Sequence, residues 1–257
     1  MSKKEVANVE ENQFPATRPD FMSDTARGQE NVGMEDLTIP RLDVIQDLSP
    51  QHKENKPEYI EGAKPGLLFN SVSGRLYGDK VFFIPVYFRK EWIIWRHQNA
   101  GGGFKGAFGS LAEAQAEFNA EGYAGKTIKV NGSDVDEYEI VDTAQHFGLV
   151  LNGDQTMEDI VISMAKSKAK VSRSLNTQVK MNGGDRFSRV YEIKAIEDQN
   201  GAGQDYWNLN IKGLGFVSEE MYHRAEALYE AISSGQRDVK REEAEAEAKE
   251  KADYEVQ

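Results

Sequence analysis

The chain has 257 residues and a formal net charge of −12, with 31 Lys and Arg against 43 Asp and Glu. Hydrophobic residues make up 39% and charged residues 29%, which excludes a membrane-embedded protein and a wholly disordered one; no apolar run approaches the ~20 residues of a transmembrane helix. Cysteine is absent, which excludes disulfides, thiol catalysis and cysteine-ligated zinc.

The two ends of the chain are acidic. Residues 1–36 hold eight Asp and Glu against four Lys and Arg and show no apolar period, so we expect a flexible acidic arm. No apolar segment follows Lys4, which predicts no signal peptide and a location in the cytoplasm, that of the host if the protein is viral. Residues 236–257 are rich in Ala, Glu and Lys without an apolar face and predict a charged acidic C-terminal tail.

Residues 37–235 are expected to form one domain that begins with short strands. A first strand is predicted over Leu67–Val72, and the strongest β segment is Lys80–Arg96, dense in Val, Phe, Ile, Tyr and Trp. Pro85 inside it indicates an edge position or a bulge. Alternation predicts two faces, with Phe82, Ile84, Val86 and Phe88 on one and Val81, Phe83, Tyr87 and Arg89 on the other.

A glycine-rich loop over residues 99–109 separates this strand from a predicted helix. Ser110 has the pattern of an N-cap, with Glu113 at the capping-box position, and the helix is expected to reach Ala120. Short strands follow at Ile128–Val130 and Tyr138–Val141 around the turn signal Asn131-Gly132, then at His146–Leu151 and Asp159–Ile162.

From Ser163 the pattern changes to a helical period that ends at residues 182–184. One side of this helix is apolar, and the opposite side carries Lys166, Lys170, Arg173, Thr177 and Lys180. A hairpin of Phe187–Ile196 and Tyr206–Ile211 is predicted next, and a last helix starts at Ser218. The fold class is therefore β-rich (α+β): an OB-like barrel with long insertions, a basic amphipathic helix and a C-terminal helix, not a doubly wound fold.

The middle of the chain is basic. Residues 166–194 hold eight Lys and Arg against two acids, and residues 80–105 hold five against one. Aromatic residues alternate with this charge, and single-stranded nucleic acid is bound by such mixtures, because cations contact phosphates while aromatic rings stack on bases. Instead of binding nucleic acid, any one of these aromatic residues could belong to the core. The basic side of the helix could likewise be only a solvated face.

Catalytic patterns are weak. The four His residues have no metal-ligand spacing, and Gly125-Lys126-Thr127 lacks the first glycine of a P-loop. Asp185, Glu192 and Lys194 have the spacing of a metal-dependent nuclease, against a cross-strand ion pair as the ordinary alternative. We therefore expect a non-catalytic protein without cofactors.

Three features together resemble phage-encoded single-stranded DNA-binding proteins of the OB-fold type. They are the aromatic and basic strand Phe82–Arg96, the basic helix Lys166–Lys180 with the hairpin Ser188–Ile211 after it, and the acidic terminal extension. Leu37–Leu42 and Gly62–Asn70 also resemble phage replication-locus proteins. The resemblance implies sequence-independent binding of single-stranded DNA in replication or recombination, with replication or recombination proteins as partners of the acidic tail.

The residues expected at the interface fall into two groups. Stacking on bases is assigned to Trp92, Trp95, Tyr191 and Trp207. Phosphate contacts are assigned to Arg89, Lys90, Arg96, Lys105, Lys166, Lys170, Arg173, Lys180 and Arg189. The second interpretation is a structural or assembly protein whose basic patch docks an acidic partner, and the third is the metal-dependent nuclease. The two apolar faces of Lys80–Phe88 would also suit the interface of a homo-oligomer.

Overall fold

A computed structural model describes residues 27–29, 37–153, 156–199 and 203–236. The predicted acidic arm, apart from residues 27–29, and the predicted tail from residue 237 onward lie outside these residues. The described strands are β1 (Leu42–Val44), β2 (Leu68–Asn70), β3 (Leu76–Gly78), β4 (Lys80–Arg96), β5 (Phe104–Phe108), β6 (Thr127–Val130), β7 (Ser133–Asp136), β8 (Tyr138–Leu151), β9 (Met157–Ala165), β10 (Arg189–Gln199) and β11 (Asp205–Phe216). The α-helices are α1 (Leu111–Ala120), α2 (Ala169–Asn182) and α3 (Glu219–Ser233), and a short 3-10 turn, η5 (Lys166–Lys168), precedes α2.

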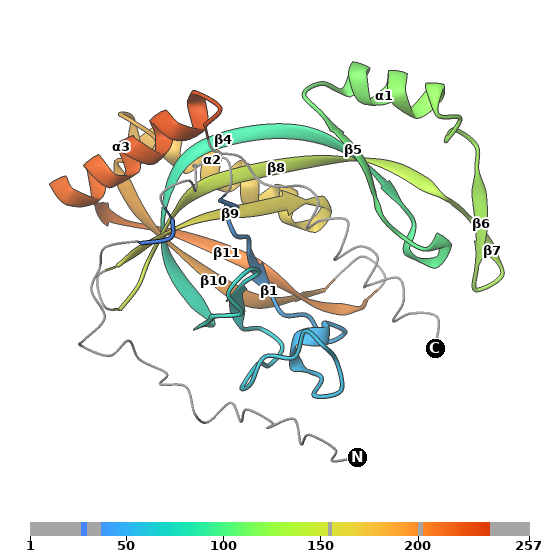
Figure 1. Cartoon of the computed structure of the whole chain (residues 1–257), viewed down its shortest axis with the longest axis horizontal. Coiled ribbons are helices and arrows are strands. Elements are labelled where there is room, and N and C mark those ends of the chain that lie inside the picture. The colour runs from blue at the N-terminus through green and yellow to red at the C-terminus, as the bar shows by residue number, and fades with distance from the viewer. Residues whose placement is uncertain (1–26, 30–36, 154–155, 200–202, 237–257) are drawn as a thin grey trace, which may run out of the picture.

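The main sheet is antiparallel and has the order β11-β10-β4-β8-β9, with β5 paired to β4. Strands β1, β2 and β3 form a second small sheet, and β6 and β7 form a hairpin. In Figure 1, β4 and β8 curve from the region of α2 and α3 to the region of β5, α1 and the β6–β7 hairpin. The β-rich, helix-decorated fold is confirmed; no pairing among the described strands closes the main sheet, so the OB-like barrel remains a prediction.

Two apolar clusters fill the two faces of the main sheet. One cluster centres on Phe83, Met164 and Leu175 and is covered by α2, while the other centres on Ile84, Phe147 and Leu228 and is covered by α3. Burial of both faces explains why the sequence of β4 is apolar on both sides at its start. The sheet thus positions α2 on one face, with the side of the helix opposite Leu175 exposed.

The bulge predicted at Pro85 is present. The register between β4 and β8 shifts between Pro85 and Tyr87, and between residues 84 and 91 β4 pairs only with β8. The extra residue moves Phe88 into the cluster of Phe83 and Tyr87 into the cluster of Ile84. The simple alternation expected along the strand holds for Val86 and is wrong from Tyr87 onward, because a bulge inserts one residue into the pleat.

Several element boundaries differ from those expected. The two strands predicted at Tyr138–Val141 and His146–Leu151 are one strand, β8, because its polar middle pairs with β4 on one side and β9 on the other. The helical period expected from Ser163 starts later, since residues up to Ala165 pair with β8 and α2 begins at Ala169. The turn at Asn131-Gly132 joins β6 to β7, not to residues 138–141.

Candidate nucleic-acid interface

The exposed side of α2 carries three of the predicted phosphate contacts. Lys170, Arg173 and Lys180 are all exposed, and the helix contains no Asp or Glu. Among the described residues none of the three forms an ion pair. Lys170 acts on Asp198, whose pKa is lowered first by a hydrogen bond from Asn208 and last by the charge of Lys170. This side of α2 therefore brings together three exposed cations that have no ion pair within the described part of the chain.

An exposed aromatic ring lies beside the C-terminal end of α2. Phe216, at the end of β11, is 74% exposed, and the guanidinium of Arg189 lies 4.7 Å from its ring centre. Arg189 Nη1 donates to Asn182 Oδ1 at 3.0 Å and Nη2 donates to the carbonyl of Leu214 at 3.2 Å, which fixes the guanidinium over the ring. A cation held on an exposed aromatic face is suited to stacking a base.

Sequence reasoning missed two exposed apolar side chains, Phe216 and Met181, of which Met181 is 80% exposed. The signal for Phe216 was its position opposite Arg189 in the β10–β11 hairpin. The expected hairpin ended at Ile211, five residues too early, so this pair was not seen.

Of the predicted stacking residues, Tyr191 is buried and Trp207 is partly buried against the core. Tyr191 is 1% exposed, and its hydroxyl accepts a hydrogen bond from Asn182. Trp207 packs on the α2-side cluster and so closely on Gly66 that a Cβ there would lie 2.7 Å from its ring. The core alternative therefore describes Tyr191, whereas Trp207 packs on the core while remaining partly exposed, and its stacking role stays a prediction.

The predicted residues of β4 and β5 are dispersed. Lys90 lies over the Trp92 ring at 4.9 Å and pairs with Asp142, while Arg89 pairs with the buried Glu91 and lies over Phe147. Lys105 is exposed on β5. Lys90 and Trp92 therefore form a further cation–aromatic pair, whereas Arg89 is held in an ion pair with a buried carboxylate.

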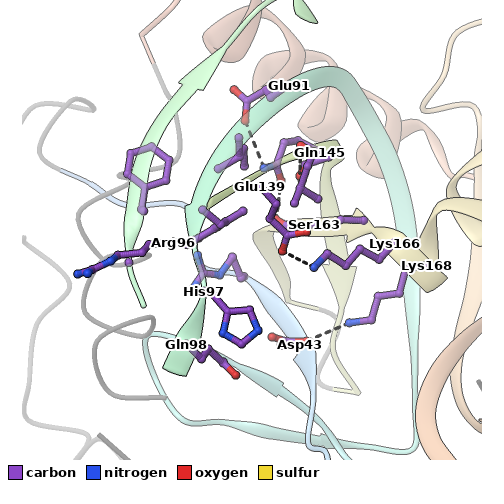
Figure 2. A pocket seen from close by; sticks show the side chains of 18 of the residues that line it. Asp43, Glu91, Arg96, His97, Gln98, Glu139, Gln145, Ser163, Lys166 and Lys168 are labelled. Carbon is purple, nitrogen blue, oxygen red and sulfur yellow. Dashed lines mark hydrogen bonds and ion pairs between the residues drawn. The ribbon is translucent and has the colours of Figure 1, made fainter. Parts of the chain in front are cut away.

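A cavity of about 520 Å³ gathers three further predicted residues, Trp95, Arg96 and Lys166. Figure 2 shows Lys166 directed to Glu139 and Lys168 to Asp43 at this cavity. Arg96 Nη2 lies 2.8 Å from Glu137 Oε1. These three cations are therefore neutralised locally, unlike those on α2.

A buried polar cluster lies beneath α2. Arg186 Nη2 donates to His146 Nδ1 at 2.9 Å, so His146 Nε2 carries the proton and donates to Ser172 Oγ at 2.8 Å. Burial, and secondarily the charge of Arg186, lowers the pKa of His146 to about 3, and burial lowers the pKa of Arg186 to about 10. Arg186, which counts toward the basic middle of the sequence, thus lies in the interior and not on the interface.

The three residues of the nuclease alternative each contact a different side chain and do not form one site. Glu192 pairs with Lys80 at 3.4 Å across β10 and β4, Lys194 pairs with Asp79 at 3.3 Å, and Asp185 accepts a hydrogen bond from Tyr222. Within the described ranges no group of three or more His, Cys, Asp and Glu could hold a metal ion. The Lys80–Glu192 contact is the cross-strand ion pair that the ordinary reading predicts.

The fold and this surface define a β-rich protein with a helix that presents an exposed cationic side. A family model described as Pam3 phage gp34-like protein matches residues 9–238, so the chain belongs to this phage protein family. No curated protein and no solved structure matches the chain. None of the described helices is long and apolar enough to cross a membrane.

Proposed function

We propose that the protein is a non-catalytic, sequence-independent single-stranded DNA-binding protein that acts in phage DNA replication or recombination in the host cytoplasm. The observation that supports the proposal is the exposed side of α2, where Lys170, Arg173 and Lys180 have no ion pair among the described residues. In this proposal, the curved main sheet has the role of the sheet in an OB-like barrel, and α2 adds the phosphate-binding side.

The overall charge of −12 makes the position of these cations important. An acidic surface repels nucleic acid, so binding is confined to a region where cations are locally in excess. From Lys170 to Lys180 the helix rises by about 15 Å, at ~1.5 Å per residue, which is long enough to follow several phosphates of one strand. Unstacked bases at its end would reach Phe216 beside Arg189, and because duplex bases are not exposed in this way, a single strand is favoured.

A second candidate function is an assembly role, in which the same basic surface docks an acidic protein. The observation that favours it is the edge strand β11, which has no described partner beyond β10 and exposes Leu214 and Phe216. An unpaired, partly apolar strand edge can accept a strand of another protein. A stable complex with another phage protein combined with no oligonucleotide affinity would support this candidate over the first.

The proposal is tested by replacing Lys170, Arg173 and Lys180 together with Gln. We expect about a 10- to 100-fold loss of affinity for single-stranded DNA near 0.1 M salt, and a slope of log K against log salt smaller by about 2, since each lost phosphate contact removes ~0.7 of slope. Titration of a labelled oligonucleotide at several salt concentrations measures both.

The control replaces Lys64, Lys126 and Lys129 with Gln, because these exposed lysines are away from α2 and give the same change in net charge. The control should bind with nearly wild-type affinity and slope. Equal losses in both triple variants would show that α2 has no special part, and this role for α2 would have to be abandoned.

A further inference from the structure

Helix α3 covers only part of its face of the main sheet. The strands it packs on are β4 and β8, whereas β10 and β11 lie beyond β4 in the sheet order. On β10, Tyr191 and Ile193 belong to the α2-side cluster, so Glu192 and Lys194, which alternate with them, point to the face of α3. Lys194 is exposed there. Within the described part of the chain, this corner of the sheet is therefore accessible to solvent.

Two rows of side chains cross this corner. Directly opposite residues of an antiparallel pair point to the same face. The register aligns Lys212, Glu192 and Phe82 in one row and Asn210, Lys194 and Lys80 in the next. We call Lys80, Phe82, Glu192, Lys194 and Lys212 the lysine face. Its three lysines come from three neighbouring strands, and all three are exposed.

The lysines of this face repel one another in the protein alone. Lys80 lies directly opposite Lys194 across β4 and β10, and like charges in such a pair destabilise a sheet. Lys80 pairs with Glu192 at 3.4 Å and Lys194 pairs with Asp79 at 3.3 Å, both longer than the ~2.7–2.9 Å of a charge-assisted hydrogen bond. Lys212 forms no ion pair among the described residues. In a protein of net charge −12, this arrangement favours an anionic ligand that separates the ammonium groups.

An aromatic ring lies among these lysines. Phe82 is 41% exposed, and Lys80 Nζ lies 5.9 Å from its ring centre. Lys80 and Phe82 are two residues apart on β4 and point to the same face. A ring exposed on a sheet between lysines can stack a base while the cations contact the neighbouring phosphates. The anion that suits this face is therefore one that also carries flat rings, which is the chemistry of a single nucleic-acid strand.

The lysine face is within reach of α2. Lys170, at the start of the cationic side of α2, acts electrostatically on Asp198, which accepts hydrogen bonds from Asn208 and Tyr206. Asp198 follows Lys194 by four residues of β10, about 13 Å at ~3.3 Å per residue. Over these residues β10 pairs only with β11, and two-stranded ribbons twist strongly. A strand that leaves α2 at Lys170 can therefore continue along β10 to Lys194.

We infer that the lysine face is a second contact surface for the bound single strand, with phosphates at Lys80, Lys194 and Lys212 and one base stacked on Phe82. The inference rests on the proposed function and extends it from one surface to two. A long oligonucleotide spans both surfaces, whereas a short one occupies the surface with the larger excess of cations, which is α2. The two surfaces are therefore distinguished by oligonucleotide length.

The test replaces Lys80, Lys194 and Lys212 together with Gln in the full-length protein and titrates labelled dT oligonucleotides of about 30 and about 8 nucleotides. For the longer one we expect about a 10-fold loss of affinity near 0.1 M salt and a slope of log K against log salt smaller by about 2, from ~0.7 per phosphate contact. The shorter one should bind within about 2-fold of wild type. The triple variant of Lys64, Lys126 and Lys129, which has the same net charge, is the control and should bind both oligonucleotides as wild type does.

A second variant tests the stacked base. Phe82→Leu keeps an apolar side chain but removes the ring, so the longer oligonucleotide should bind about 10-fold more weakly. The salt slope should stay as in wild type, because stacking releases no counterions. The urea midpoint of unfolding shows that each variant is folded.

The outcomes separate the two claims. Wild-type binding of the longer oligonucleotide by the lysine-face variant, or an equal loss in the control, would overturn the second surface and leave single-stranded DNA binding in place. An equal loss for both oligonucleotide lengths would also overturn it, and wild-type binding by Phe82→Leu would overturn the stacked base. No binding of either oligonucleotide by wild-type protein at low salt would overturn the proposed function and the second surface together.

Discussion

Gly148→Ala is expected to destabilise the protein by about 3 kcal/mol or more, the largest single-site effect that the structure predicts. A Cβ at this position would lie 2.2 Å from the carbonyl oxygen of Ile84 and 2.5 Å from the ring of Phe83. Neither neighbour can move without a large energetic cost. The Ile84 oxygen belongs to the main chain next to the bulge, and the Phe83 ring is fully buried. The urea midpoint of unfolding, followed by circular dichroism, measures the loss.

Gly215→Ala is the matched control. Gly215 also lies in a strand, β11, but nothing stands within 4 Å of the position of its added Cβ. We expect a change within about 0.5 kcal/mol, as for most surface substitutions. A Gly148→Ala protein as stable as wild type would mean that β4 and β8 do not approach each other at the bulge in the way described.

The second large effect is a loss of stability in mild acid that depends on His146. The pKa of this histidine is lowered from 6.5 to about 3 in the folded protein, first by burial and then by Arg186. The unfolded chain therefore takes up a proton first as the pH falls, so the stabilisation is complete above pH 6.5 and decreases progressively toward pH 3. The expected loss between pH 7 and pH 5 is about 2 kcal/mol.

His146→Gln should remove most of this dependence, since Gln does not titrate, although it lowers stability at pH 7 through lost packing. Ser172→Ala is the control, because it removes the acceptor of the Nε2–H hydrogen bond but keeps the titrating ring beside Arg186. It should lower stability without flattening the pH dependence. Parallel stability–pH curves for wild type and His146→Gln would contradict the buried neutral state of this histidine.

Local sequence patterns predicted those elements whose bounds and geometry are determined by their own residues. The bounds of β4 were predicted, and the capping box of α1 is present, with Ser110 and Glu113 each accepting a hydrogen bond from the other's backbone. The bulge at Pro85 followed from the missing N–H of proline. The start of α2 was wrong because Ser163 and Ala165 join β9 through pairing with β8, an interaction between distant segments that a local period does not contain.

The candidate site was predicted in part for the same reason. The cations of α2 could be found from a helical period without acids on one side, which is a local pattern. Sequence could not separate the buried Tyr191 and the partly buried Trp207 from the exposed Phe216, because burial depends on packing against other segments, such as Gly66 against the ring of Trp207. The cavity could not be predicted at all, since its walls come from segments between residues 41 and 168.

The central claim is tested most directly by fluorescence anisotropy of a labelled single strand of about 30 nucleotides with purified full-length protein, at low and at moderate salt. A matched duplex and a single-stranded RNA serve as comparisons, and Mg²⁺ is added to detect cleavage. We predict tight binding of the single-stranded DNA that weakens steeply with salt, clearly weaker binding of the duplex, and no cleavage. Absence of binding at low salt would contradict the proposed function, and the cationic side of α2 would then have to serve a protein partner.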